Sequence, residues 1–395
     1  MSRRGELDAL IVGGGAIGAA LALALAHEEF DVALVEARTP KPWSRDEDVD
    51  LRVVALAADA RALFEDLGVW RAIEGARVGP YRLMRVWDAS APGEIAFDAA
   101  ENGDAALGWI IENRLIQHAL WQAASANPHV RIVCPGEVAG VDNESERASV
   151  VLADGTQFAA RVLIAADGAE SPVRAKLGIA CSERDYAQRA VVAHLATALP
   201  HEDTAWQRFL PTGPLAFLPL ADGRSSIVWT LPAAEAARVL ALDDAAFRAE
   251  VGAAFDFRLG EITATTARAA FPLRMRLADR YVAGRVVLAG DAAHVVHPLA
   301  GQGMNLGFRD VACLRRVLAD ARDRGSDLGA AHVLRRYERE RRSENALAAR
   351  GLDAIERVFD TPGMPAAWLR GVALATAQHM SPLKEMLAAA AAGRR

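Results

Sequence analysis

Short runs of apolar residues, separated by polar or glycine-rich turns, recur along this chain. Runs of four or five apolar residues predict strands buried on both faces, because such strands need no polar alternation. Strands of this kind are expected at residues 9–12, 32–35, 162–166 and 285–289. A second group, typical of a separate sheet, is expected at residues 190–196, 216–220 and 226–229.

The segments between these strands have helical patterns, and the alternation predicts an α/β fold. The sequence has no internal repeat and no long low-complexity linker. After Leu306 the pattern is helical to the C-terminus, with breaks at Pro362, Pro365 and Pro382. Because strands of the first kind occur both before and after the second group, we expect the domains to be interleaved.

The stretch 9–26, which reads ALIVGGGAIGAALALALA, has two incompatible interpretations. Behind two arginines, an uncharged run of about 18 residues is typical of a signal peptide or a short transmembrane helix. The glycines favour a nucleotide site instead. Gly13, Gly15 and Gly18 follow an apolar strand and precede a helical run, which is the order of a Rossmann βα unit. They would form the tight turn, admit a diphosphate and let the helix pack on the strand, respectively.

The second strand of this unit ends at Glu36, about 18 residues after Gly18. A carboxylate at this position accepts a hydrogen bond from a ribose 2′-hydroxyl and disfavours a 2′-phosphate. The bound dinucleotide is therefore expected to be FAD or NAD rather than NADP. The motif itself leaves these two open.

Composition narrows the class of protein. The 395 residues are 52% hydrophobic and carry both signs of charge, with a formal net charge of −6. That balance is typical of a globular protein with two or three domains, and it provides no basic stripe for nucleic acid. The spacing of Cys134, Cys181 and Cys313 matches no disulfide framework and no metal-ligand cluster. We therefore expect a reducing cytoplasm and no bound metal.

Two further segments carry candidate cofactor contacts. In the first, Asp167 and Gly168 follow a buried strand and open a helix. The second is the run 290–307, which places glycines, histidines and a proline between a strand and a helix. Within it, Asp291 can accept hydrogen bonds from sugar hydroxyls, and backbone N–H groups of the later glycines can stabilise an electron-rich ring edge.

With these motifs taken together, the chain resembles the group A flavin monooxygenases related to p-hydroxybenzoate hydroxylase, and among them the ring hydroxylases of ubiquinone biosynthesis. The segments that carry the narrower resemblance are 51–56, 67–70, 86–88, 111–113, 216–220, 271–273 and 297–307. The resemblance implies FAD as the cofactor, NAD(P)H as the electron donor and O2 as a co-substrate. It also implies hydroxylation of a polyprenylated phenol or benzoquinol through a flavin hydroperoxide.

The resemblance further implies FAD contacts in several parts of the chain. The first βα unit would bind the ADP half, Arg52 and Asp291 would lie near the diphosphate and ribityl chain, and the Asp-Gly pair would also serve flavin reduction. The loop 298–305 would line the isoalloxazine. Asn113 departs from the pattern, since many relatives outside the narrower family carry an arginine there. The expected contacts are Gly13, Gly15, Gly18, Glu36, Arg52, Asn113, Asp167, Gly168, Asp291, Pro298, Gly301, Gly303, Met304 and Asn305.

No residue qualifies as a catalytic base from the sequence alone. His294 and His297 are candidate acid or base groups because imidazole titrates near neutral pH, while hydrogen bonds that fix the loop are their alternative role. Aromatic residues of the second sheet can line a long apolar pocket for a prenyl chain, or they can belong to the core. The expected substrate contacts are Phe217, Pro219, Trp229 and Pro298.

The order of the elements and the resemblance together give expected domain boundaries. A discontinuous FAD-binding domain is expected at 1–75, 105–180 and 275–345, a substrate domain at 76–104 and 181–274, and a C-terminal helical segment at 346–395. That last segment has amphipathic stretches, which would pack on the FAD-binding domain or contact a membrane surface or partner proteins. We expect a cytoplasmic protein with at most peripheral membrane association.

Alternative functions stay open at this point. One is a flavin hydroxylase that acts on another aromatic substrate. A second is a non-catalytic, FAD-binding scaffold of a quinone-biosynthesis complex. An NAD-dependent dehydrogenase also fits the glycine motif with Glu36, but it leaves Asp167-Gly168 and the segment 290–307 unexplained.

Overall fold

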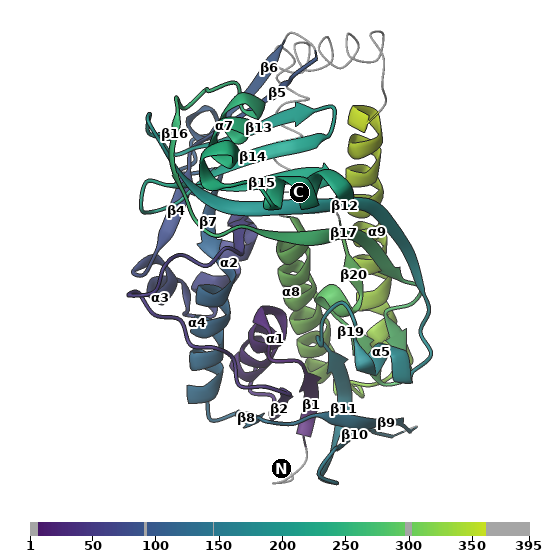
Figure 1. Cartoon of the computed structure of the whole chain (residues 1–395). Helices are drawn as coiled ribbons and strands as arrows, with labels where there is room; N and C mark the ends of the chain where they lie inside the picture. Colours follow the sequence, from purple (N-terminus) through teal and green to yellow (C-terminus); the bar gives the residue numbers. More distant parts are fainter. Residues whose placement is uncertain (1–6, 91–92, 145, 297–301, 361–395) are drawn as a thin grey trace.

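Two large sheets organise the structure, and the long strands β12 (Cys181–Thr197) and β17 (Ala269–Ala278) of the second sheet run down beside the first (Figure 1). The computed structural model describes residues 7–90, 93–144, 146–296 and 302–360. Helices cover the faces of both sheets. The predicted α/β fold class is confirmed.

The first sheet has the parallel order of a dinucleotide-binding unit. Its central strand β1 (Leu7–Val12) pairs in parallel with β2 (Val32–Val35) on one side and β11 (Gln157–Ala165) on the other. Further parallel pairs are formed by β8 (Val130–Val133) with β2 and by β19 (Val286–Leu288) with β11. The antiparallel strands of this sheet are β9 (Val138–Asn143), β10 (Ala148–Leu152) and β18 (Val282–Ala283).

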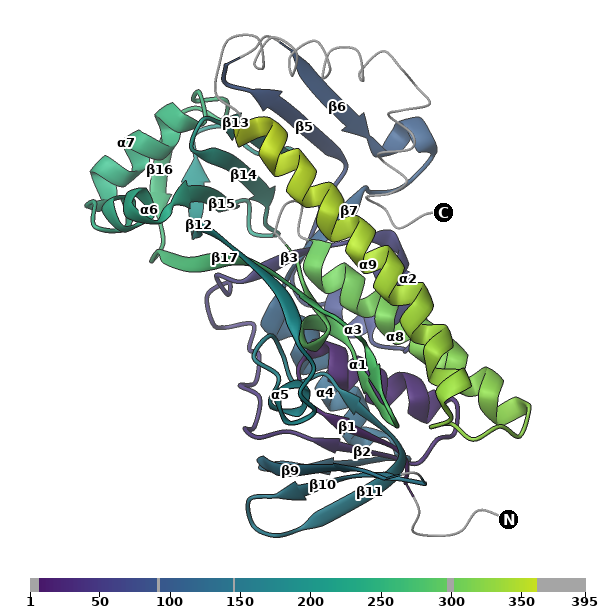
Figure 2. The same ribbon diagram turned by 90° about the vertical axis from the view of Figure 1, so that its right-hand side faces the viewer.

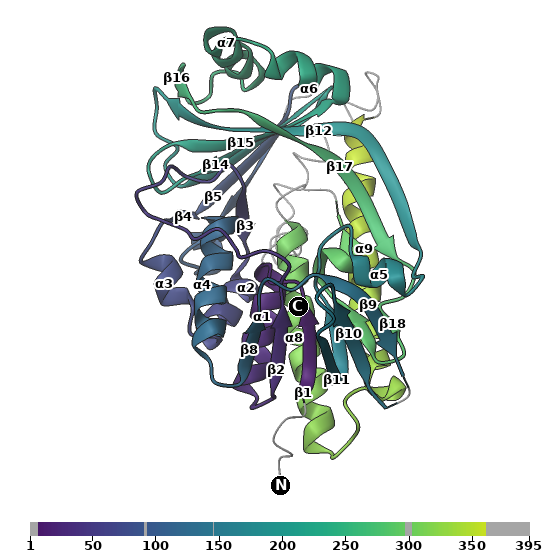
Figure 3. The same cartoon turned by 60° about the horizontal axis from the view of Figure 1, so that its bottom comes forward.

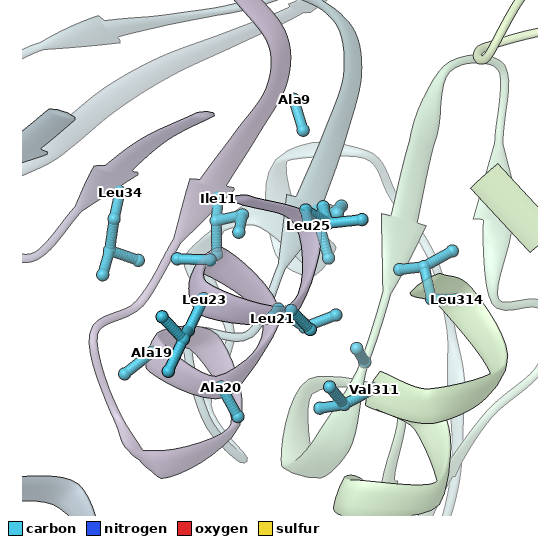
Figure 4. Packing of buried hydrophobic residues seen from close by; sticks show 14 of the residues in the cluster. Ala9, Ile11, Ala19, Ala20, Leu21, Leu23, Leu25, Leu34, Val311 and Leu314 are labelled. Carbon is cyan, nitrogen blue, oxygen red and sulfur yellow. The ribbon is translucent and has the colours of Figure 1, made fainter. Parts of the chain in front are cut away.

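Helix α1 (Ala16–His27) is buried on all sides, which explains why the stretch 9–26 resembles a membrane segment. Its residues from Gly18 to Ala26 are all buried. Figure 4 shows Leu21 and Leu25 packing toward Val311 and Leu314 of α8 (Gln302–Asp323). A helix that is apolar all round belongs in a core. Within the described ranges, no helix is long and apolar enough to cross a bilayer.

The second sheet is mostly antiparallel and is covered on one face by α6 (Ala233–Leu240) and α7 (Asp244–Ala254) (Figure 3). Its opposite face is turned toward the first sheet and its helices. In spatial order the strands are β20 (His294–Val295), β17, β12, β15 (Ser225–Pro232), β14 (Gly213–Pro219), β13 (Thr204–Leu210), β5 (Leu83–Asp88) and β6 (Glu94–Asp98), with β16 (Ile262–Thr265) also paired to β12.

Smaller elements connect the two sheets. A small antiparallel sheet contains β3 (Val53–Leu56), β7 (Gly108–Glu112) and β4 (Val78–Tyr81). The remaining helices are α2 (Ala58–Asp66), α3 (Trp70–Glu74), η1 (Ala99–Asn102), α4 (Asn113–Ala126), α5 (Pro172–Lys176), η2 (Gly290–Ala292) and α9 (Ala331–Asp360). Helices α8 and α9 lie side by side along the molecule (Figure 2). The predicted domain boundaries stay a prediction.

Candidate cofactor and substrate site

A cavity of about 890 Å³ lies between the first βα unit and the open face of the second sheet. Its walls come from segments that are far apart in the sequence. Around the first βα unit they include Gly15, Arg52, Asn113, Gly168, Asp291, Gly303 and Met304. On the second sheet, β12 and β15 contribute Val192, Ser226 and Val228, while β12 and β17 also contribute charged residues such as Glu183, Asp185 and Arg274. The cavity therefore has a polar, backbone-rich end at the α1 turn and, at Val192 and Val228, an apolar end on the second sheet.

The first turn of α1 presents free N–H groups to this cavity. Gly15 is the N-cap residue, no side chain caps the helix, and its first turn contains no acidic residue. Uncapped N–H groups and the helix dipole together favour a bound anion. A Cβ atom at Gly15 would meet nothing within 4 Å, so the space beside these donors is open. The arrangement fits a diphosphate group.

The other two glycines of the motif are required by close backbone packing. Gly13 has φ +103°, in the left-handed region, and a Cβ there would lie 2.3 Å from the carbonyl oxygen of Ala166. A Cβ at Gly18 would lie 1.7 Å from the carbonyl oxygen of Gly13. These two glycines therefore shape the turn, whereas Gly15 leaves room next to it.

The Glu36 carboxylate holds this glycine turn from the end of β2. Its Oε2 accepts a hydrogen bond from the Gly14 N–H at 2.5 Å, and its Oε1 accepts one from the Arg38 N–H at 3.0 Å. On the other side, Gln117 Nε2 donates to the Gly14 carbonyl oxygen at 3.0 Å. Sequence reasoning missed Gln117, since nothing in the pattern links α4 to the turn.

Three polar side chains expected to contact FAD meet on the cavity wall. The Arg52 guanidinium lies over the Phe271 ring, 5.2 Å from its centre. Asn113 Oδ1 is buried and has no hydrogen-bond partner among the described residues. The surrounding protein raises the pKa of Asp291, an effect that His294 and Arg52 partly offset. The unpaired Asn113 oxygen is an acceptor that a bound hydroxyl or N–H donor would satisfy, and the exposed Asp291 carboxylate can accept a hydrogen bond from a bound hydroxyl.

Asp167 lies behind this wall, while Gly168 lines it. Asp167 Oδ2 accepts a hydrogen bond from the Val173 N–H at 3.0 Å, and Oδ1 has no partner in the described part of the chain. Burial raises the pKa of this carboxyl, although Ser171 lowers it. Its contact with α5 fixes the loop that carries Gly168.

Asn305 and His294 serve the scaffold rather than the cavity. The Asn305 side chain donates to the Ala55 carbonyl oxygen and accepts from the Ala57 N–H, each at 2.9 Å, so it joins α8 to the end of β3. His294 is fully buried behind the wall, and its Nε2 donates to Asp310 at 2.6 Å. Both roles depend on contacts that only the folded chain shows. His297, Pro298 and Gly301 lie outside the described residues.

Asp310 is the centre of a buried charged network that the sequence analysis did not predict. Besides His294, its Oδ2 accepts from the Gly290 N–H at 3.0 Å. Its Oδ1 accepts from Arg341 Nε at 2.7 Å, and Asn345 Nδ2 lies 3.3 Å away. Burial alone would raise the pKa of Asp310, but His294 and Arg341 outweigh it and lower the pKa to about 2. The network joins α8 and α9 to the strand that precedes Asp291.

The expected substrate contacts Phe217, Pro219 and Trp229 lie on the wrong face of the second sheet. Phe217 and Trp229 belong to the core under α6 and α7. There the Phe217 ring stacks on the Phe255 ring, with the ring centres 3.8 Å apart. Pro219 is two residues after Phe217 on β14, so its side chain lies on the same face of the sheet. The residues that face the cavity are their neighbours on the strands, including Val228. Period-two alternation separates these two sets, and the sequence alone does not say which set faces the cavity.

A second unpredicted group is the cluster around Glu112. Its carboxylate accepts hydrogen bonds from Trp43 Nε1 at 3.0 Å, from the Asp50 N–H at 2.8 Å and from Arg77 Nε at 3.0 Å. These contacts fasten the segment before Leu51 and Arg52, both of which line the cavity. An acidic residue at the end of the apolar run 108–111 was a signal for a buried carboxylate. Within the ranges described above, no group of three or more metal-ligating side chains is found.

Comparison with known proteins identifies the kind of site. A family model described as an FAD binding domain matches residues 6–350. The 3-demethoxyubiquinol 3-hydroxylase of Escherichia coli (strain K12) is 38% identical over 374 residues, which cover 95% of each chain. The chain belongs to the FAD-dependent monooxygenase family. Its cofactor is therefore FAD, and the family uses NAD(P)H as the typical electron donor.

One further relative and one solved structure are also similar to this chain. The mitochondrial ubiquinone biosynthesis monooxygenase COQ6 of Homo sapiens is 35% identical over an alignment of 434 residues, gaps included. The alignment covers 97% of this chain and 92% of that one. The crystal structure of p-nitrophenol 4-monooxygenase PnpA from Pseudomonas putida DLL-E4 has a TM-score of 0.78 at 17% identity and covers 99% of each chain. The first is a relative by sequence, and the second is similar in fold.

Proposed function

We propose that this monooxygenase hydroxylates the aromatic ring of a polyprenylated phenol or benzoquinol in ubiquinone biosynthesis, using NAD(P)H and O2. The observation that carries the proposal is the continuous cavity, which runs from the uncapped α1 turn to the apolar face of the second sheet. A cavity of this kind can hold an elongated dinucleotide at one end and an apolar ring at the other. The relatives at 38% and 35% identity, a 3-demethoxyubiquinol 3-hydroxylase and a ubiquinone biosynthesis monooxygenase, support this substrate class.

In this proposal the α1 turn, open at Gly15, binds the FAD diphosphate, and Glu36 binds the adenosine ribose. Arg52, Asn113 and Asp291 hold the central part of the cofactor. When bound, FAD would supply the redox chemistry by which NAD(P)H and O2 are used in ring hydroxylation. The chain itself orients the ring and excludes water at the apolar end of the cavity.

Glu36→Gln is expected to weaken FAD binding about tenfold. The neutral amide keeps the shape of the side chain, but it replaces charge-assisted hydrogen bonds to the Gly14 N–H and to the ribose with weaker neutral ones. Titration of the apoprotein with FAD, followed by flavin fluorescence, measures the dissociation constant. Glu29→Gln, an exposed glutamate after α1, is the control and should leave that constant unchanged. Equal constants for Glu36→Gln and the wild type would exclude a role for Glu36 in the cofactor site.

We also propose that the substrate reaches the cavity from a membrane surface or from a partner protein of a ubiquinone-biosynthesis complex. A prenyl chain partitions into the bilayer with about 0.8 kcal/mol for each buried CH2 group, so free substrate in water is scarce. Flotation of the holoprotein with vesicles that carry a prenylphenol tests this route. Flotation with loaded vesicles supports it, and turnover of vesicle-bound substrate without any association contradicts it.

A product assay tests the proposed activity against its alternatives. The yellow holoprotein is supplied with NAD(P)H, O2 and either a short-chain prenylphenol or an unprenylated phenol of the same ring. We expect a hydroxylated product from the prenylated compound. Hydroxylation of the unprenylated phenol alone would assign a different aromatic substrate. Bound FAD without substrate-dependent NAD(P)H oxidation would assign a non-catalytic scaffold.

A further inference from the structure

Two buried side chains near the apolar end of the cavity each have one polar atom without a hydrogen-bond partner in the described part of the chain. Ser226 on β15 lines the cavity and is 1% exposed, and its Oγ has no hydrogen-bond partner among the described residues. His194 on β12 is also 1% exposed, and in the same part of the chain its Nδ1 is unpaired. Buried polar atoms normally have a hydrogen-bond partner, so two neighbouring atoms without one beside a cavity need an explanation.

The strand register places these two side chains next to each other. His194 is directly opposite Ser226 in the antiparallel pair of β12 and β15. The backbone N–H and carbonyl of His194 both bond to Thr266, on the side away from β15. His194 and Ser226 therefore form a non-hydrogen-bonded pair, the kind in which facing side chains come closest. Both side chains lie on the same face of the sheet as Val192 and Val228, and of the two it is Ser226 that forms part of the cavity wall.

The contacts of His194 fix which of its nitrogens carries the proton. Its Nε2 lies 3.1 Å from the Asp50 carbonyl oxygen, which can only accept, so Nε2 is the donor. Burial lowers the pKa of His194; the Asp50 hydrogen bond, Asp48 and Asp222 raise it, and Arg224 lowers it. The ring is therefore neutral near pH 7, and Nδ1 presents a lone pair.

We propose that Ser226 Oγ and His194 Nδ1 together bind the ring hydroxyl of the aromatic substrate. The substrate O–H donates to His194 Nδ1, and the same oxygen accepts from the Ser226 hydroxyl. This double contact orients the ring within the apolar end of the cavity. Acceptance by Nδ1 also polarises the O–H bond and raises the electron density of the ring, which favours electrophilic hydroxylation. The inference rests on the proposed function, since it assigns the recognition of that substrate.

The strand supplies a matched control for Ser226. Ser225 is the adjacent residue, is also 1% exposed, and its Oγ also lacks a partner within the described ranges. Its side chain points to the opposite face, because it is paired with Leu195 and Pro219. Ser225→Ala therefore makes the same chemical change in the same strand without touching the cavity.

The test measures binding of a short-chain prenylphenol and of its methyl ether to the oxidised holoenzyme by calorimetry. We expect the wild type to prefer the phenol about tenfold, because the ether has no proton to donate to His194. Ser226→Ala should weaken binding of the phenol about tenfold, and His194→Leu should remove the preference for the phenol. Ser225→Ala should behave as the wild type.

The outcomes separate this inference from the proposed function. If the wild type hydroxylates the prenylphenol but Ser226→Ala binds it as tightly as Ser225→Ala does, the assignment of the hydroxyl site is overturned and the proposed function stands. Equal affinity of the wild type for phenol and ether also overturns it. If the wild type neither binds nor hydroxylates prenylphenols, the proposed function fails, and this inference fails with it.

Discussion

Gly15→Ala is expected to remove FAD from a chain that still folds. The φ of Gly15 is −65°, which alanine adopts readily, and the added Cβ meets no atom within 4 Å. The substitution at this N-cap should therefore cost the apoprotein about 1 kcal/mol or less. In the holoprotein the methyl group occupies the space where the diphosphate approaches the backbone. We expect FAD affinity to fall by about 100-fold, which corresponds to roughly 2.8 kcal/mol.

Gly18→Ala is the informative contrast within the same motif. Its Cβ would meet the Gly13 carbonyl oxygen, so α1 must move away from the turn. Because α1 is buried from Gly18 to Ala26, we expect a loss of folded protein rather than a selective loss of flavin. Thermal unfolding of the apoproteins and the FAD dissociation constant together distinguish the two variants. A Gly15→Ala protein that keeps FAD with wild-type affinity would exclude the α1 turn as the diphosphate site.

Arg341→Met is expected to destabilise the protein by about 3–5 kcal/mol. Arg341 and Asp310 are each at most 1% exposed and are joined at 2.7 Å. Removal of the guanidinium leaves the Asp310 carboxylate buried without the positive charge of its Arg341 partner. Removing a single partner of a buried ion pair is strongly destabilising, because the remaining charge is no longer balanced. Chemical denaturation measures the change in the free energy of unfolding. A cost below about 1 kcal/mol would contradict the assignment of this pair as a fully buried network.

The same two helices provide a control pair at the surface. Arg316 on α8 and Glu340 on α9 lie 2.7 Å apart with side chains 48% and 32% exposed. Glu340→Gln should therefore cost no more than about 1 kcal/mol, since exposed ion pairs gain little in water. Both ion pairs join α8 to α9, so the comparison sets a buried pair against an exposed one at the same helix interface.

The dependence of stability on acidic pH also tests the buried network around Asp310. The pKa of Asp310 in the folded chain is about 2, below its usual 3.8, so its ionised form stabilises the fold. That contribution is complete above the usual pKa and is lost as the pH falls through about 2. The stability difference between the wild type and Arg341→Met should therefore shrink below about pH 4. A difference that stays constant from pH 5 to pH 2 would contradict this.

The first βα unit was predictable because every part of it is local in sequence. The strand 9–12, the glycines and the helix follow one another, and Glu36 ends the next strand at the expected distance. The structure has this order, with β1 and β2 adjacent and parallel. A bound dinucleotide followed for the same reason, since the glycine motif lies within a single turn between a strand and a helix, whereas FAD in particular was implied by the resemblance.

The orientation of the second sheet and the buried charges were not predictable in the same way. Aromatic residues such as Phe217 mark a strand, but its two faces are distinguished only when α6 and α7 pack on one of them. Arg341 lies on a helix rich in charged residues, and the others whose side chains the structure describes are partly or fully exposed. Its burial depends on Asp310, 31 positions away on another helix. Such contacts are properties of tertiary packing, and no local spacing records them.

The measurement that tests the central claim most directly is the fate of labelled oxygen. The holoprotein is reduced anaerobically with NAD(P)H in the presence of a short-chain prenylphenol, and ¹⁸O2 is then admitted. The account predicts substrate-stimulated bleaching of the flavin, followed by a ring-hydroxylated product that carries one ¹⁸O atom. A flavin that reoxidises with peroxide as the only labelled product, and with the prenylphenol unchanged, would contradict it.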